Sequence, residues 1–60
     1  MTLKEYREKK KLTMKALGEL LGLSTGAINN YEKGARIPKK DVMARIEEAT
    51  NNWVKAQDFY

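Results

Sequence analysis

The 60-residue sequence contains neither cysteine nor histidine. Without cysteine, neither disulfide bonds nor thiolate zinc sites can reinforce the small core of such a chain. Without histidine, the chain lacks the commonest general base, the usual metal ligand and every Ser-His or Cys-His catalytic arrangement. No apolar run approaches the roughly 20 residues that a membrane-spanning helix needs. The composition therefore argues against an enzyme, a metalloprotein and a membrane protein.

The residues that are present suit one small globular domain. Hydrophobic residues make up 42% of the chain and charged residues 33%, which is enough apolar material for a packed core. We expect a single domain over residues 1–60, because the chain has no room for a second. Met1 is followed directly by a charged segment, which is unlike a secretory signal. We therefore expect a soluble, cytoplasmic protein that binds no cofactor, metal or small-molecule substrate.

Positive charge is concentrated in the first two thirds of the chain. Residues 1–40 carry ten basic and four acidic side chains, a net +6, whereas residues 41–60 carry two and four, a net −2. A basic front half favours a polyanionic partner such as nucleic acid. On charge alone, a lysine-rich face that serves only solubility is the alternative. Lys9, Lys10 and Lys11 either complement the dipole at the end of a first helix or contact phosphate.

Capping residues and apolar spacing predict two helices in the first third of the chain. Thr2 and Glu5 form a capping box, which starts a helix over about residues 3–10. Thr13 has the residue type of an N-cap, and the apolar spacing that follows predicts a second helix over residues 14–21. Gly22 ends this helix, since glycine tolerates the left-handed conformation found after many helices.

The remaining sequence predicts two further helices and a short helical end. Ser24 caps a third helix that runs to about Lys33, and Gly34 stops it. Pro38 breaks the chain, and apolar spacing then predicts a fourth helix over about residues 39–50. Asn51 and the next residue are a turn signal, and residues 56–59 suit a last helical turn. The predicted fold is therefore all-α, with four to five helices.

The second and third predicted helices are joined by three residues that include a glycine, a geometry typical of the helix-turn-helix. Gly18 allows the third helix to approach the second, and Gly22 takes the tight turn. The apolar contact between the two helices is assigned to Leu17, Leu21, Leu23, Ile28 and Tyr31. We therefore expect a helix-turn-helix over about residues 14–33.

On a helical wheel, the third predicted helix has one face that carries only polar residues and one glycine. The members of this face are Thr25, Gly26, Asn29, Asn30 and Lys33. Hydroxyl and amide groups are what a helix in the major groove of DNA needs for reading base edges. An ordinary solvated face would more often carry Glu–Lys pairs than two adjacent asparagines, which are poor helix formers. The pattern predicts that this helix reads double-stranded DNA.

Glu32 lies on the inner arc of the same wheel, where a carboxylate needs a cationic partner. Arg7 lies on the inward side of the first helix. We predict a buried Arg7–Glu32 pair that orients the first helix against the third and adds little net stability. Two unrelated surface charges are the alternative.

A resemblance to a known family becomes visible in these residues. It is carried by Leu12-Thr13 through Leu17-Gly18, Leu21-Gly22-Leu23-Ser24, Ile28, and Tyr31-Glu32-Lys33-Gly34 to Pro38. Over about residues 2–50 the chain resembles the Cro and repressor type of helix-turn-helix transcription regulators of phages and bacteria. The opening Met1-Thr2-Leu3-Lys4-Glu5-Tyr6 and the run Ala27-Ile28-Asn29 are similar in particular to phage Cro proteins.

The resemblance implies a lambda-repressor-like regulator that binds an operator in a bacterial host cell. It implies base-reading positions at Thr25, Gly26, Asn29 and Asn30, and the predicted Arg7–Glu32 pair matches an ion pair typical of the family. Many relatives carry a phosphate-binding glutamine where this chain has Met14, so backbone N–H groups at that helix start must take over. Phosphate contacts are predicted for the residues beside the reading face: Thr13, Lys15, Ser24, Arg36, Lys39 and Lys40.

A single helix-turn-helix reads few base pairs, so we expect a homodimer at least on a pseudo-palindromic operator. The predicted dimer surface is the less basic end of the chain, with Trp53, Val54, Phe59 and Tyr60. A tail that covers the open side of the core is an equal interpretation of these residues. The alternative function is a protein-interaction module, such as an antirepressor or antitoxin, because aromatic side chains anchor many interfaces. RNA binding is disfavoured by the lack of an aromatic platform beside the basic residues.

Overall fold

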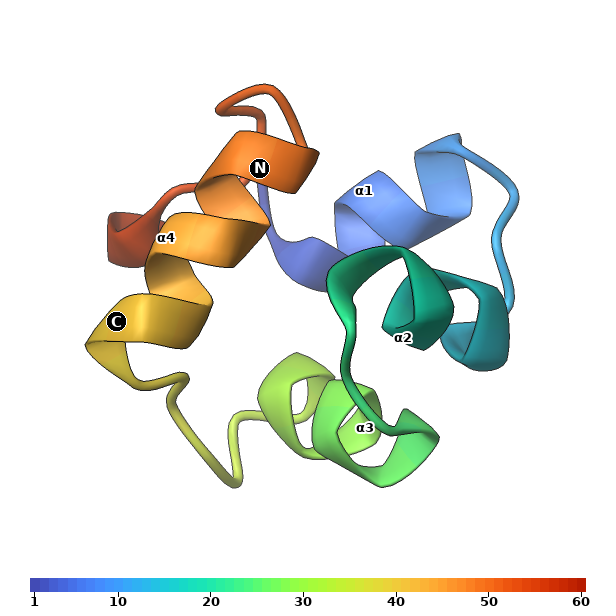
Figure 1. Ribbon diagram of the computed structural model, residues 1–60, viewed down its shortest axis with the longest axis horizontal. Helices are drawn as coiled ribbons and strands as arrows, with labels where there is room; N and C mark the ends of the chain where they lie inside the picture. Colours follow the sequence, from blue (N-terminus) through green and yellow to red (C-terminus); the bar gives the residue numbers. More distant parts are fainter.

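The computed structural model describes all 60 residues and contains helices but no β-strand (Figure 1). Its elements, in order, are α1 (Leu3–Lys9), α2 (Met14–Leu21), α3 (Thr25–Glu32), α4 (Lys40–Ala49) and the 3-10 helix η1 (Ala56–Phe59). The predicted all-α fold is confirmed. The ranges expected for α1, α3 and α4 were slightly longer because they included the capping residues Lys10, Lys33, Lys39 and Thr50.

Side-chain caps start the first three helices. The Thr2 hydroxyl accepts the Glu5 N–H at 3.1 Å, and the Glu5 carboxylate accepts the Thr2 N–H at 2.8 Å. These bonds lower the pKa of Glu5, with the Thr2 backbone N–H as the main cause. The Thr13 and Ser24 hydroxyls accept N–H groups in the first turns of α2 and α3. Each cap satisfies a backbone donor that a helix start otherwise leaves unpaired.

The turn between α2 and α3 depends on two glycines. Gly22 has φ +71° and ψ +31°, the left-handed conformation that glycine adopts without steric cost. The N–H of Leu23 donates to the carbonyl of Gly18 at 2.7 Å. A Cβ atom on Gly18 would lie only 2.5 Å from the Leu23 carbonyl oxygen. Gly18 is therefore required by the backbone of the turn, and not by the approach of α3 that the sequence predicted.

The core draws on all four α-helices and on the tail after α4. Seven buried side chains form it: Leu3, Tyr6, Leu17, Leu21, Ile28, Ile46 and Val54. Outside this core, Arg45 of α4 donates a hydrogen bond to the Leu21 carbonyl at 3.2 Å, which pairs an otherwise free acceptor at the end of α2. These contacts fix α2 and α3 as one unit against α1 and α4.

The tail after α4 closes one side of this core. The Val54 side chain is 0% exposed, and its N–H donates to the hydroxyl of Thr50, which is also buried. The Ala56 N–H donates to the Glu47 carboxylate at 2.9 Å, which holds the start of η1 against α4. The assignment of Val54 to an exposed dimer surface was therefore wrong. A branched apolar side chain packs more favourably in the core than in water.

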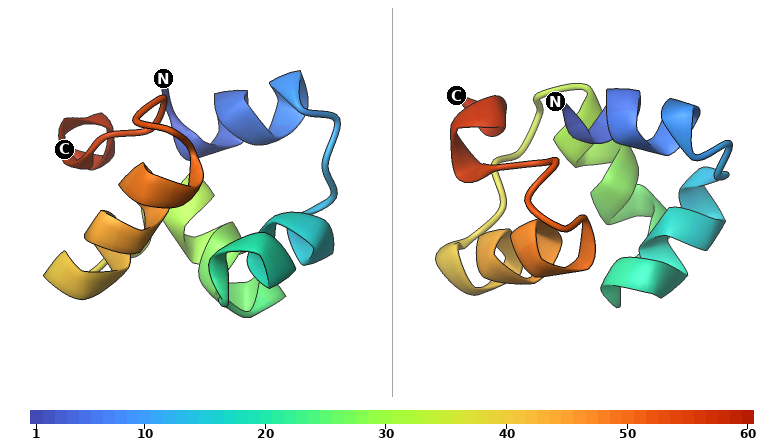
Figure 2. Two further views of the ribbon diagram at one scale, coloured as in Figure 1. Left: turned by 45° about the horizontal axis from the view of Figure 1, so that its top comes forward. Right: turned by 90° about the horizontal axis from the view of Figure 1, so that it is seen from above.

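The fold gives the molecule two opposite sides. In Figure 1, α3 forms the bottom of the molecule, while α1 and the turn after α4 lie at the top. The left view of Figure 2 shows the same separation, with the start of the chain next to the turn after α4. The Met1 amine donates to the Trp53 carbonyl at 2.7 Å across this junction. The exposed surface of α3 is thus separate from the junction between the start and the end of the chain.

Candidate nucleic-acid interface

The predicted reading residues lie together along α3. Thr25, Gly26, Asn29 and Lys33 are exposed, and Asn30 is half-buried. No hydrogen bond within the protein uses the side chains of Thr25, Asn29 or Asn30. The Asn30 carbonyl accepts N–H groups from the two residues after Gly34, which ties the next loop to the end of α3. The helix thus presents free amide and hydroxyl groups to solvent.

The start of α2 lies beside α3 and has free backbone donors. The Thr13 hydroxyl accepts the Ala16 N–H at 3.0 Å. The N–H groups of Met14 and Lys15 have no acceptor within the protein. Such groups at the positive end of a helix dipole favour an anion. Met14 is half-buried and packs against the core. Its side chain therefore makes an apolar contact and offers no hydrogen bond to a phosphate.

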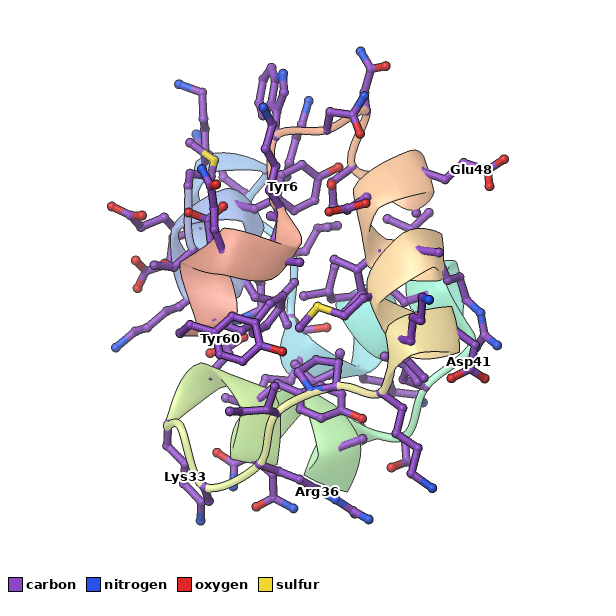
Figure 3. The ribbon with its side chains drawn as sticks, turned by 90° about the vertical axis from the view of Figure 1, so that its left-hand side faces the viewer. Tyr6, Lys33, Arg36, Asp41, Glu48 and Tyr60 are labelled. Carbon is purple, nitrogen blue, oxygen red and sulfur yellow. The ribbon has the colours of Figure 1, made fainter.

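The predicted phosphate-binding side chains are exposed and carry uncompensated charge. Lys15, Ser24, Arg36, Lys39 and Lys40 are all exposed, and none of the four cations among them forms an ion pair. Figure 3 shows Lys33 and Arg36 at the same end of the molecule, around the end of α3. Lys39 and Lys40 follow at the start of α4. Cations therefore flank the polar face of α3 on its carboxyl-terminal side.

Arg7 and Glu32 form a bidentate ion pair between α1 and α3. The Arg7 Nε and Nη2 atoms donate to the two Glu32 carboxylate oxygens at 2.6 Å and 3.1 Å. A third bond runs from Arg7 Nη1 to the Leu12 carbonyl at 3.2 Å. The Glu32 side chain is 5% exposed and that of Arg7 18%. The hydrogen bonds to Glu32 raise the pKa of Arg7, and the two parallel bonds fix the orientation of α3 against α1.

One open cavity of about 210 Å³ lies between α1, α2 and α3. It is lined by Lys4, Arg7, Met14, Asn29, Glu32 and Lys33. Because Glu32 is engaged by Arg7, the lysines give this hollow a positive charge next to Asn29. Lys4 was not predicted to lie in this region. A lone lysine on an exposed helical surface gives no signal of where the neighbouring helices lie.

Two lysines at the end of α1, Lys9 and Lys10, lie beside Trp53 and not beside the polar face of α3. Lys10 places its Nζ atom 4.6 Å from the ring centre of Trp53, and Lys9 lies 6.0 Å from the same ring. Trp53 in turn contacts Tyr6, which Figure 3 shows at the end of the molecule opposite Lys33 and Arg36. Lys9 and Lys10 therefore lie beside Trp53 and apart from the cations around the end of α3, and a phosphate contact for Lys9, Lys10 and Lys11 stays a prediction.

The four residues predicted for a dimer surface do not lie together. Trp53 packs edge-on against Tyr6 with ring centres 5.9 Å apart, whereas Phe59 packs against Tyr31 at 6.4 Å. Tyr60 is 83% exposed, and Val54 belongs to the core. The tail therefore both covers the core and leaves separate aromatic groups in contact with solvent.

Two capped helices joined through a left-handed glycine, with a free polar face on the second, define a helix-turn-helix protein. Residues 3–52 match the family described as Helix-turn-helix (HTH_3), and the chain belongs to this family. Membership supports binding to double-stranded DNA. No helix is both long and apolar enough to cross a membrane.

A known relative gives a second comparison. Over 47 residues the chain is 36% identical to Multiprotein-bridging factor 1 of Candida albicans. The match covers 78% of this chain and 31% of that protein, so the chain corresponds to less than a third of the relative's length. No solved structure matches the chain significantly. These comparisons do not single out the phage Cro proteins.

Proposed function

We propose that this protein is a sequence-specific transcription regulator that represses by binding an operator, as Cro proteins do. In this proposal α3 enters the major groove, a docking mode that is general for helix-turn-helix proteins. Asn29, with Thr25 and Asn30 beside it, reads base edges. The observation that carries the proposal is the free amide of Asn29, exposed on α3 and flanked by unpaired cations.

The phosphate contacts in this proposal come from three places. The free N–H groups of Met14 and Lys15 bind one phosphate at the start of α2. Arg36, Lys39 and Lys40 bind the backbone on the other side of the groove. Gly26 has open space around its Cα and offers no side chain, so it permits close approach to the groove. Base contacts then specify the site, while phosphate contacts fix its register.

The test uses a site selected from random duplexes and two matched substitutions. Asn29→Ala is expected to reduce the difference in binding free energy between the selected and the random duplex by about 1–3 kcal/mol. A bidentate asparagine–adenine contact contributes discrimination of that size. Gln57→Ala removes an exposed amide on η1 and is expected to change neither affinity. Fluorescence anisotropy on selected and random duplexes measures both. Equal losses on the two duplexes after Asn29→Ala contradict the reading assignment.

We further propose that two copies bind together on a pseudo-palindromic site, with half-sites about one DNA turn apart. Tyr60 and the exposed part of Phe59 on η1 are the aromatic groups still available for contact between copies. Sedimentation velocity is expected to detect two protein copies on a full site and one on a half-site. A one-to-one complex on the full site refutes the paired arrangement.

A protein-interaction module is the second candidate function. The name of the Candida albicans relative describes a factor that bridges several proteins, and this chain also exposes an aromatic side chain at Trp53. A module of this kind keeps the fold without operator binding. Failure to enrich any duplex from a random pool, with the protein folded, favours this candidate over the first.

A further inference from the structure

Trp53 forms the centre of an exposed patch with Lys9 and Lys10, here called the lysine–tryptophan patch. The Trp53 side chain is 40% exposed although it is the largest apolar group in the chain. Its indole packs edge-on against Tyr6, and its carbonyl accepts a hydrogen bond from the Met1 amine. The ring is therefore held in one orientation in contact with solvent. Ordered aromatic groups of this kind are the usual anchors of protein interfaces, because they lose little entropy on binding.

The two lysines of the patch are exposed and have no carboxylate partner within the protein. The two ion pairs of the structure join Met1 to Asp58 and Arg7 to Glu32, so neither neutralises these lysines. Lys10 lies over the Trp53 ring, within the distance of a cation–π contact. The patch thus combines an apolar centre with uncompensated positive charge.

The position of the patch separates it from the proposed DNA surface. Tyr6, which supports Trp53, and the pair Lys33 and Arg36 lie at opposite ends of the molecule in Figure 3. Figure 1 agrees, with α1 and the turn after α4 on the side away from α3. DNA bound along α3 therefore leaves this patch accessible. Its charge needs a different partner.

We propose that the lysine–tryptophan patch is a docking site for an acidic segment of another protein. Carboxylates of the segment pair with Lys9 and Lys10, and an apolar side chain of the segment packs on Trp53. Charge complementarity guides such association, and the aromatic centre supplies the desolvated contact. A nucleic-acid strand fits less well, because base stacking needs a free aromatic face and Lys10 occupies a face of this single indole. The proposal does not depend on DNA binding.

Trp53 is the only tryptophan of the chain, so its fluorescence reports directly on the patch. The probe is a fluorescein-labelled peptide of Asp and Glu residues around one Leu and one Phe. Its counterpart carries Asn and Gln in place of the acidic residues. The acidic peptide is expected to change Trp53 emission in a saturable manner and to bind more weakly as salt rises, whereas the neutral peptide is expected to leave the emission unchanged.

Two pairs of substitutions remove the same charge from opposite ends of the molecule. Lys9→Gln with Lys10→Gln is expected to weaken binding of the acidic peptide roughly tenfold, since two exposed charge contacts are lost. Lys39→Gln with Lys40→Gln is expected to change peptide binding by less than about twofold, since screening suppresses distant charges. Equal losses for the two pairs show that only net charge matters, and they overturn the proposal.

Two further outcomes also overturn the proposal. The first is the absence of any saturable binding of the acidic peptide to the folded protein. The second is tighter binding of a labelled oligo-dT strand that is lost with Lys9→Gln and Lys10→Gln, since this assigns the patch to nucleic acid. Duplex binding by the same variant is measured in parallel. Failure of duplex binding in the parent protein refutes the operator proposal and leaves the peptide result intact.

Discussion

Replacing Arg7 by methionine removes three hydrogen bonds between α1 and its surroundings while keeping a long apolar stem. Two of the lost bonds hold the carboxylate of Glu32, whose side chain is only 5% exposed. The third holds the Leu12 carbonyl in the turn before α2. A buried carboxylate that loses its partner destabilises a fold by about 3–5 kcal/mol. A domain of this size has about 3–9 kcal/mol of total stability, so Arg7→Met is expected to unfold much of the protein.

The measurement is urea unfolding followed by circular dichroism and by Trp53 emission. A double variant, Arg7→Met with Glu32→Met, serves as the control because it removes the unpaired carboxylate as well. It is expected to recover most of the lost stability, apart from about 1 kcal/mol for the bond to the Leu12 carbonyl. An Arg7→Met protein with the parent's unfolding midpoint refutes the reasoning. A double variant as unstable as the single one shows that the loss does not come from the stranded carboxylate.

Three further predictions concern the turn, α3 and the tail. Gly18→Ala is expected to destabilise the fold by about 1–3 kcal/mol in thermal unfolding, because the new Cβ meets the Leu23 carbonyl oxygen; Gly26→Ala, in open helical surroundings, is expected to stabilise it by up to about 1 kcal/mol. The Lys55 backbone N–H and, to a lesser degree, the Met1 amine hold the pKa of Asp58 below its ordinary value. This contribution to stability is therefore present above the pKa of the unfolded chain and is lost as pH falls through the folded pKa, below about pH 4. Trp53 emission is expected to report this loosening in acid, and an Asp58→Asn variant that keeps the transition contradicts it.

Local patterns explain why the helices could be predicted from sequence. Thr2, Thr13 and Ser24 cap helices as predicted, because capping depends on residues three positions apart. Gly22 adopts the expected left-handed conformation for the same local reason. The helical wheel also placed Glu32 on the inner side of α3, where the structure pairs it with Arg7. These features need no knowledge of how distant segments pack.

The features that could not be predicted depend on tertiary packing. Lys9 and Lys10 have the same sequence character as the lysines beside α3, and only the fold separates the two groups. Val54 stands in a stretch too short for periodicity, so its burial against α4 leaves no pattern in the sequence. Gly18 was recognised as a close-contact position, but the neighbour that requires it is the turn backbone and not α3. A helical wheel shows on which side of one helix each side chain lies, but it does not show which other segments pack against that side.

The burial of Val54 sets the boundary of the transferable unit. The family match ends at residue 52, two positions before a side chain that is 0% exposed. A gene fusion that joins a foreign sequence directly after residue 52 keeps every helix from α1 to α4 but removes a side chain whose burial contributes about 1.5–3 kcal/mol. Such a chimaera has a cavity in its hydrophobic core at the place of the Val54 side chain. Engineers who graft this module onto other proteins therefore need to carry the turn after α4 with it, even though family similarity does not extend that far.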